Sequence, residues 1–305
     1  MQRSFRLWLD RIWSNITWRR VVVVILVLLV AAAARVAYLL WPEWTGFGEK
    51  TLWDLLELLI IPAVLGFGAL WFNQAARSGE QKIASDQQRE QALQNYLDKM
   101  AELLLKEKLL EKKDKSVDPV VDVAQVRTVT TLRILDQERK SILFQFLRDA
   151  NLSDFLLAEA SLAEADLSNT RMVSINLDGA DMRATNLSDA YFRDGSMRGA
   201  DLNGSKLFGA YLLGVDMKNV LMIGADLSSA SLISIDLRKA QMTYVILRKA
   251  YLASVLLNGA DFTGADLRGA ILDWSNLEGS NITEEQLLMA RSLKGTVMPD
   301  GTEHE

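Results

Sequence analysis

The sequence predicts a mixed fold: an N-terminal two-span α-helical membrane hairpin and a helical stalk, then a square solenoid with helical caps. Three observations predict it. Two apolar runs of about twenty residues lie near the N-terminus, a charged stretch with almost no Gly or Pro follows, and a five-residue pattern repeats without insertion from Ala150. The predicted regions are, in chain order, 1–20, 21–72, 73–115, 116–149, 150–284 and 285–305.

The composition argues against several classes of function. The 305 residues include no Cys and a single His, His304, next to the last residue. Without Cys there is no disulfide framework, thiol nucleophile or thiolate metal site, and one His disfavours a catalytic triad, a His metal cluster or a proton shuttle. The net charge of −5 disfavours general nucleic-acid binding. We therefore expect no catalytic site, no cofactor, no metal and no nucleic-acid partner.

Two segments in the region 21–72 are predicted to span a membrane. Val21 to Leu40 carries one charge, Arg35, and has the length that crosses a hydrocarbon core of about 30 Å. Trp53 to Phe72 is as long, and a short loop separates the two. A cleaved signal peptide fits poorly, because the first run is too long and a second span follows.

The basic residues before the first span set the expected orientation. They are Arg3, Arg6, Arg11, Arg19 and Arg20, against Asp10 alone. The positive-inside rule therefore places both termini in the cytoplasm. Apolar residues recur between these arginines at helical spacing, so region 1–20 is predicted to lie in the headgroup layer, with its arginines facing anionic lipid. A disordered basic tail is the alternative.

Two charged residues lie within the predicted spans. Arg35 and Glu57 are each a few residues from the outer end of their span, so an antiparallel hairpin brings them to similar depth. They form a candidate intramembrane ion pair. Arg35 could equally extend its side chain to the interface.

Helices are predicted between the membrane and the repeats. Region 73–115 has mixed charges, no Pro and one Gly, which is typical of a helical stalk. Its apolar stripe at Leu93, Leu97, Met100 and Leu104 could be a short coiled-coil seam or a face packed against the same chain. After a break, Val120 to Arg148 is predicted as one helix that covers the first coil of the repeats.

The repeats run from Ala150 to Glu284 as 27 consecutive blocks of five. The third position is Leu, Met, Phe or Ile in all of them, and the first is Ala in fourteen. A strict period of five is neither helix nor ordinary strand. One large and one small inward residue per block suit a chain that turns a corner at every block. Four blocks then close a square coil of about twenty residues, and coils stack at about 4.8 Å.

The pattern resembles the pentapeptide repeat family, whose A(D/N)LXX motif recurs almost literally, for example at Ala165-Asp166-Leu167 and Ala200-Asp201-Leu202. The resemblance implies a right-handed quadrilateral β-helix. The N-terminal half is similar to that of bacterial membrane-anchored members, which implies a bacterial inner or thylakoid-type membrane. At the other end, Thr283 to Gln286 is typical of a capping box. We expect a short helix through Ala290 that covers the last coil, then a turn and tail to Glu305.

Residues twenty apart should stack, so the sequence can be read as four surfaces. One collects Arg171, Tyr191, Tyr211, Ser231, Tyr251 and Ile271, with a neighbouring column that includes Leu213 and Ile233. An exposed apolar and aromatic patch usually marks a contact surface. The candidate protein-contact residues are Tyr191, Tyr211, Leu213, Ile233, Tyr251, Ile271 and Trp274. A helix of the same chain, another copy or a different protein could cover them.

A second surface stacks Arg198, Lys218 and Arg238 beside Ser196, Asp216 and Asp236. Because the cations have acidic neighbours, we expect a solvated charged face rather than a phosphate-binding groove.

These patterns favour a membrane-anchored, non-enzymatic scaffold that presents a rigid rod in the cytoplasm to an unidentified protein partner or to another copy. The alternative is DNA mimicry, because some soluble members of the resembled family protect type II topoisomerases in this way. Residues 149–282 hold 17 acidic and 11 basic residues, a modest excess of acid spread over several faces. An enzyme or an oligomeric channel is less favoured.

Overall fold

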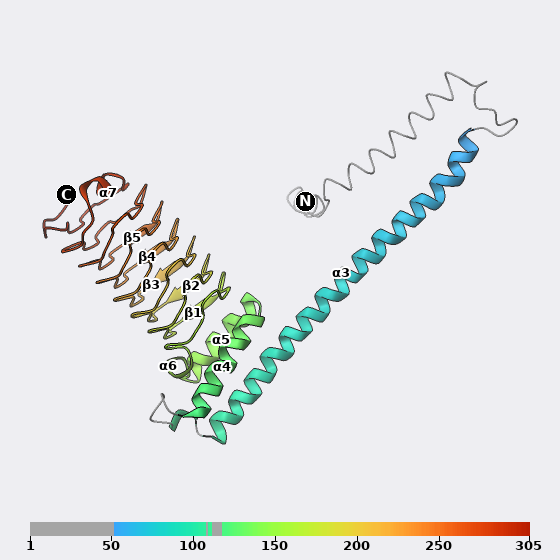
Figure 1. Ribbon diagram of the computed structural model, residues 1–305, viewed down its shortest axis with the longest axis horizontal. Helices are drawn as coiled ribbons and strands as arrows, with labels where there is room; N and C mark the ends of the chain where they lie inside the picture. The colour runs from blue at the N-terminus through green and yellow to red at the C-terminus, as the bar shows by residue number, and fades with distance from the viewer. Residues whose placement is uncertain (1–51, 108, 112–117) are drawn as a thin grey trace, which may run out of the picture. The chain divides into compact units, whose positions relative to one another are not determined.

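The computed structural model describes residues 52–107, 109–111 and 118–305 (Figure 1). The chain divides into two units after Lys82. The helices are α3 (Leu52–Leu105), η1 (Leu109–Glu111), α4 (Pro119–Ile134), α5 (Gln137–Asp149), α6 (Ser153–Leu156) and α7 (Glu284–Leu288). The strands are β1 (Arg171–Val173), β2 (Tyr191–Arg193), β3 (Tyr211–Leu213), β4 (Ser231–Ile233) and β5 (Tyr251–Ala253).

The described part of the first unit is the beginning of α3. The predicted second span, 53–72, lies on this helix, whereas region 1–20, the first span and Arg35 lie outside the described residues. Glu57 is on α3, but its side chain is outside the described part. Across residues 52–107, 109–111 and 118–305, no helix is both long and apolar enough to cross a bilayer. The helix ends at Leu105, earlier than the stalk predicted to reach Lys115.

In the second unit, the end of α3 packs with α4, α5 and α6 in a helical cap. The predicted stripe on α3 is a packed face, with Leu93 and Met100 buried beside Tyr96. The Tyr96 hydroxyl lies 2.8 Å from Thr128 Oγ1 of α4 in a buried hydrogen bond. The Tyr96 ring also meets the Phe146 ring of α5 edge-on.

The predicted single helix from Val120 to Arg148 is two helices, so that prediction was wrong in this detail. Leu135 adopts an extended backbone after α4, and the Asp136 side chain accepts a hydrogen bond from Arg139 N at the start of α5. An Asp at this position caps a new helix. The chain therefore doubles back before it enters the repeats.

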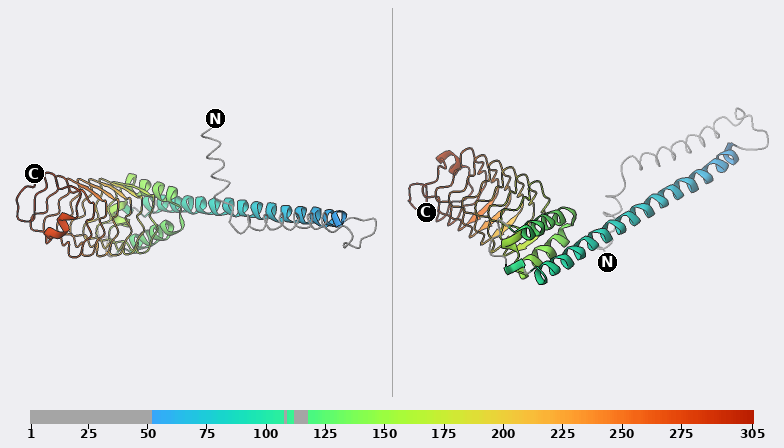
Figure 2. Two further views of the ribbon diagram at one scale, coloured as in Figure 1. Left: turned by 90° about the horizontal axis from the view of Figure 1, so that it is seen from above. Right: turned by 60° about the horizontal axis from the view of Figure 1, so that its bottom comes forward.

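The repeats form a parallel β-solenoid (Figure 2). Strands β1 to β5 are consecutive neighbours in one parallel sheet, with Arg171 opposite Tyr191, Tyr191 opposite Tyr211, and so on at a spacing of twenty residues. Isolated parallel bridges repeat the same spacing on the other sides, from Ser161↔Asp181 to Leu256↔Asn276. The predicted coil of about twenty residues is thus confirmed.

The core of the solenoid is built from the first and third positions of each block. All the third-position side chains, from Leu152 to Ile282, are buried. The fifth residue of every block from Glu159 to Gly279 has φ between 51° and 71°. This left-handed conformation turns each corner and explains the frequent Gly, Asn, Asp and Ser there.

Gly195 shows how tightly the core is packed. It follows the bulky third-position Phe192, and a Cβ at Gly195 would lie 2.7 Å from the Phe192 ring and 2.5 Å from Ile175 O. Ile175, Val215, Ile235 and Val255, at first positions of the same face, are bulky and buried. The large ring and the missing side chain therefore compensate for each other.

At the start of the solenoid, side chains of the helical cap take the place of a preceding coil. Within the solenoid, carbonyl oxygens such as Asp178 O accept a bond from the preceding coil. The first coil has no predecessor, and its carbonyls accept from helix side chains instead: Gln125 Nε2 to Ala158 O (3.2 Å), Arg133 Nη2 to Ala163 O (3.3 Å) and Lys140 Nζ to Asp166 O (2.5 Å). Unpaired edge groups are thereby satisfied.

The C-terminal end differs from the expected turn and tail. The capping box at Thr283 and Gln286 is present, and α7 ends at Leu288. The chain then returns to the ladder, with Ile271 opposite Ser292 and Asn276 opposite Val297, and Glu303 pairs antiparallel with Val297. The spacing across α7 is one residue longer than in the repeats, so the returning blocks fall outside the five-residue frame.

A candidate protein-contact face on the repeat domain

Asp and Asn at the second position of the blocks accept a hydrogen bond from the backbone of their own block. Asp201 Oδ1 accepts from Asn203 N at 3.0 Å, and Asp226 Oδ1 accepts from Ser228 N at 2.9 Å. The same bond, from the backbone N–H two residues on, recurs at Asp166, Asn176, Asp181, Asn186, Asp216, Asp236, Asp261, Asp266 and Asn276. Such turns satisfy a backbone N–H that the ladder leaves unpaired.

In two blocks whose second position is neither Asp nor Asn, the preceding coil supplies the oxygen. Leu221 cannot cap its own block, and Ile223 N donates instead to Asn203 Oδ1 at 2.7 Å. Ser196 likewise leaves Arg198 N to donate to Asp178 Oδ1 at 2.7 Å. Adjacent coils therefore complement each other, twenty residues apart in the sequence.

The β1–β5 face has no such turns, because its blocks form strands. Three of its five outward second positions carry rings: Tyr191, Tyr211 and Tyr251. The Tyr191 and Tyr211 rings stack with centroids 5.5 Å apart and planes 3° from parallel. The Arg171 guanidinium carbon lies 4.7 Å from the centre of the Tyr191 ring. Arg171, Tyr191 and Tyr211 thus form one stacked column, as the twenty-residue spacing predicts.

The structure places all seven predicted contact residues on or beside this face. Tyr211, Tyr251 and Trp274 are exposed by 37%, 41% and 59%, and the other four are half-buried. We name these seven residues the aromatic face. Among the described helices, α5 packs against β1, at one end of the face. No described helix removes Tyr211, Tyr251 or Trp274 from solvent.

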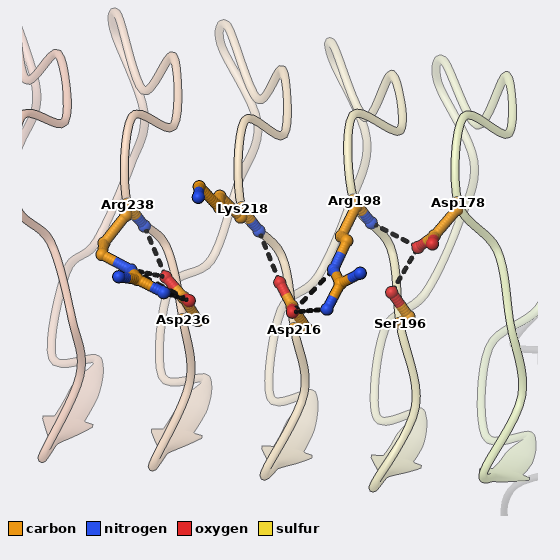
Figure 3. A network of polar contacts seen from close by, with 7 residues as sticks. All are labelled: Asp178, Ser196, Arg198, Asp216, Lys218, Asp236 and Arg238. Atoms are coloured by element: carbon orange, nitrogen blue, oxygen red, sulfur yellow. Dashed lines mark hydrogen bonds and ion pairs between the residues drawn. The ribbon is translucent and has the colours of Figure 1, made fainter.

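The charged column on the neighbouring side is paired within the chain (Figure 3). Arg198 Nη2 lies 2.6 Å from Asp216 Oδ2, and Arg238 Nη2 lies 2.5 Å from Asp236 Oδ2. The Arg238 side chain lowers the pKa of Asp236 by bonding its carboxylate. The expected charged, self-paired column is confirmed for these two arginines.

Other carboxylates of the repeats are occupied in the same way. Asp266 binds Arg248 on the preceding coil and Arg268 of its own block, at 2.5 Å and 2.7 Å. These contacts, that with Arg268 first, hold the pKa of Asp266 far below its usual range. Within the described residues, no group of His, Asp and Glu is arranged to hold a metal ion.

Sequence reasoning missed one part of this surface. Between α5 and β1 lies a notch lined by Glu138, Ser141, Ile142 and Arg148 of α5 and by Arg171 and Val173 of β1. Arg171 N donates to Ser141 Oγ at 2.9 Å, which fixes the end of the aromatic face to the cap. The column spacing placed Arg171 beside Tyr191, but no periodicity links α5 to the repeats.

The fold and the surface define a parallel β-solenoid of five-residue repeats with a helical cap. The family model described as pentapeptide repeats matches residues 147–183, 185–222, 221–252 and 246–283, with eight copies. This part of the chain is therefore a pentapeptide repeat domain, and the predicted resemblance is confirmed for it.

No curated protein matches the chain. Solved structures do. QnrB1, a plasmid-mediated fluoroquinolone resistance protein, is 21% identical over 44% of this chain and 77% of its own, with a TM-score of 0.34. HetL, a pentapeptide repeat protein involved in heterocyst differentiation regulation from the cyanobacterium Nostoc, is 26% identical over 48% and 86%, with a TM-score of 0.23. A pentapeptide repeat protein of the Arabidopsis thaliana thylakoid lumen is 25% identical over 42% and 72%, with a TM-score of 0.21.

Proposed function

We propose that this protein is a membrane-anchored, non-enzymatic scaffold whose repeat domain binds a partner protein through the aromatic face. The exposure of Tyr211, Tyr251 and Trp274 on one side of the solenoid carries the proposal. Large aromatic side chains in a contiguous patch are favoured anchors of protein interfaces. On the other sides most second positions are the Asp and Asn that cap the backbone, and the exposed apolar side chains there are Phe208, Ile223, Tyr244 and Leu256.

The solenoid is suited to present such a face. Each coil is bonded to the next along several sides, and each is covered by its neighbours. In stacked repeats of this kind, each coil is held by its neighbours, so the positions of its outward side chains are fixed. A partner that spans several coils would meet rings held at fixed spacing, which lowers the entropy lost on binding.

The membrane anchor is supported by the start of α3 and by the residues before it. Leu70, Trp71 and Phe72 are consecutive on a helix, so they point in different directions, yet they are exposed by 67%, 63% and 70%. A helix that is apolar all round is stable when lipid or protein surrounds it. With the apolar run Val21–Leu40 and the arginines before it, this favours a two-span anchor with both termini in the cytoplasm of a bacterial inner or thylakoid-type membrane.

DNA mimicry is the less favoured function. A mimic needs carboxylates that stand free in rows, as phosphates do. Here Asp181, Asp216, Asp236 and Asp266 are each bonded to an arginine of the same domain. These four carboxylates are therefore not free to imitate a row of phosphates.

Photo-cross-linking tests the scaffold function. The photoreactive residue p-benzoylphenylalanine replaces Tyr211 or Tyr251 in the full chain, expressed in its own membranes. Tyr244 is the matched control, because it is an exposed Tyr of the repeats that lies outside the aromatic face. We expect a discrete cross-linked product from positions 211 and 251 and none from 244. Tyr251→Asp should abolish the product from position 211, and Tyr211→Asp the product from position 251. Equal products from all three positions, or none, would refute the contact face.

Carbonate extraction tests the anchor separately. The full chain is expected to stay with the membrane pellet at high pH, and a chain that starts after Phe72 should be released. Recovery of both chains in the supernatant would contradict the anchor.

A further inference from the structure

The notch between α5 and β1 lies at the end of the aromatic face and holds an arginine unlike the others of the repeat domain. Within the described residues, Arg183, Arg193, Arg198, Arg238, Arg248 and Arg268 each have an Asp carboxylate within 2.8 Å. Arg171 has no ion pair there. The outward positions next to Arg171, on its own strand and on the next coil, hold no carboxylate: they are Val173, Tyr191 and Arg193.

The surroundings of Arg171 leave its polar edge available. Its guanidinium lies 4.7 Å from the centre of the Tyr191 ring, which occupies a flat face of the group. Stacking of this kind leaves the in-plane N–H groups free to bind a carboxylate by two parallel hydrogen bonds. Glu138 lines the same notch without pairing with Arg171, and Arg148 Nε already donates to Asp149 Oδ1 at 2.9 Å.

We propose that the partner of the aromatic face contributes a segment with an acidic side chain that binds Arg171, followed by apolar side chains that cover Tyr211 and Leu213. This inference rests on the proposed scaffold function. Charge complementarity favours an acidic segment. Among the described residues, Arg171 is the one arginine of the repeats that has no carboxylate partner.

The spacing of the coils adds a requirement on the segment. Tyr211 is two coils from Arg171, which is about 10 Å along the stack at the usual distance between strands. An extended chain covers that distance in about three residues. Ile142, exposed by 45% on the other wall of the notch, would meet the residue before the acid.

The test uses the full chain in its membranes with p-benzoylphenylalanine at position 211 as the probe. Arg171→Gln is expected to lower the yield of cross-linked partner by about fivefold, the upper range for one exposed ion pair. Glu138→Gln should raise the yield, because it removes a carboxylate that would repel the partner's acid in the notch. Arg193→Gln is the matched control: it removes a cation from the same face that Asp194 already neutralises. An unchanged thermal midpoint in each variant shows that the fold is intact.

Mass spectrometry of the product then locates the acid. We expect an Asp or Glu within a few residues of the cross-linked position in the partner. Its replacement by Lys should abolish the product, and Arg171→Glu should restore it. A product insensitive to Arg171→Gln, a failed charge exchange or a cross-link to a second copy would overturn this proposal alone. Absence of any product from position 211 would overturn the scaffold function with it.

Discussion

The bond between Asn203 and Ile223 allows a direct test of how neighbouring coils complement each other. Asn203→Ala removes the oxygen that accepts from Ile223 N, and nothing in the same block replaces it because position 221 is Leu. Leu221→Asn should restore an acceptor two residues before Ile223, with the geometry by which Asp201 binds Asn203 N at 3.0 Å. The pair of substitutions therefore moves one cap from one coil to the next.

The size of the effect follows from the geometry of the bond. A hydrogen bond of this kind contributes about 1 kcal/mol. The bond is on the surface, where water can replace the lost acceptor, so we expect Asn203→Ala to cost about 0.5–1 kcal/mol. Leu221→Asn alone loses a half-buried leucine and adds no new cap. That loss is the same in both backgrounds, so a double-mutant cycle cancels it and should leave a coupling of about 0.5–1 kcal/mol.

Amide hydrogen exchange measured by mass spectrometry reads the local bond, and denaturant unfolding of the purified full chain reads the stability. In Asn203→Ala the peptide that contains Ile223 should exchange about two to five times faster, in line with the energy above. The rate should return towards the original in Asn203→Ala/Leu221→Asn. Leu221→Ala is the control, because it removes the leucine without supplying an oxygen. Equal exchange in Asn203→Ala/Leu221→Asn and in Asn203→Ala/Leu221→Ala would refute the reasoning.

Three further predictions concern the core, the cap and the response to acid. Gly195→Ala should destabilise the repeats by about 1–3 kcal/mol through overpacking, because its Cβ would lie 2.7 Å from the Phe192 ring. Phe192→Leu should relieve part of this destabilisation. A thermal midpoint equal to that of the wild type would contradict the prediction. Thr128→Val should cost about 2 kcal/mol in denaturant unfolding, since it leaves the buried Tyr96 hydroxyl unpaired. Tyr96→Phe should cost about half as much, because Thr128 Oγ1 still donates to Ala124 O; the opposite order would count against the assignment. The Thr263 hydroxyl and N–H and the Asn281 amide lower the pKa of Asp261 to about 2. Because this pKa is lower in the folded chain, the stabilisation is present above the ordinary pKa near 3.8 and lost as the pH falls towards about 2. Asp261→Asn should flatten that part of the curve of stability against pH. An unchanged curve would show that Asp261 does not cause the loss of stability in acid.

The periodic part of the fold could be predicted from the residues alone. The third-position side chains from Leu152 to Ile282 had to be buried, because a strict period of five with one large apolar residue leaves no other regular solution. The same period predicts that Tyr191 lies over Tyr211, as the strand register shows. The capping box at Thr283 was also recognisable, since its signal is contained within four residues.

The candidate face was predictable in its membership but not in its surroundings. Register alone assigns Tyr211 and Tyr251 to one side, whereas their exposure depends on which helix lies nearby. Asp136 starts a second cap helix and turns α5 towards β1, so the helices cover the first coil and leave the later rings in solvent. A choice between two packings of the same helices depends on contacts between distant segments, which no local pattern encodes.

Local patterns and periods therefore determined the solenoid, its four sides and the column of rings, because each coil interacts with residues at a constant separation. Only the tertiary structure decided the breaks in that regularity. Three such cases are the break after Leu135, the bond that Ile223 N donates to Asn203 Oδ1, and the return of residues 291–298 to the ladder with a shifted spacing. In each, a backbone group left unpaired by the regular pattern takes its partner from wherever the folded chain brings an oxygen or an N–H within reach.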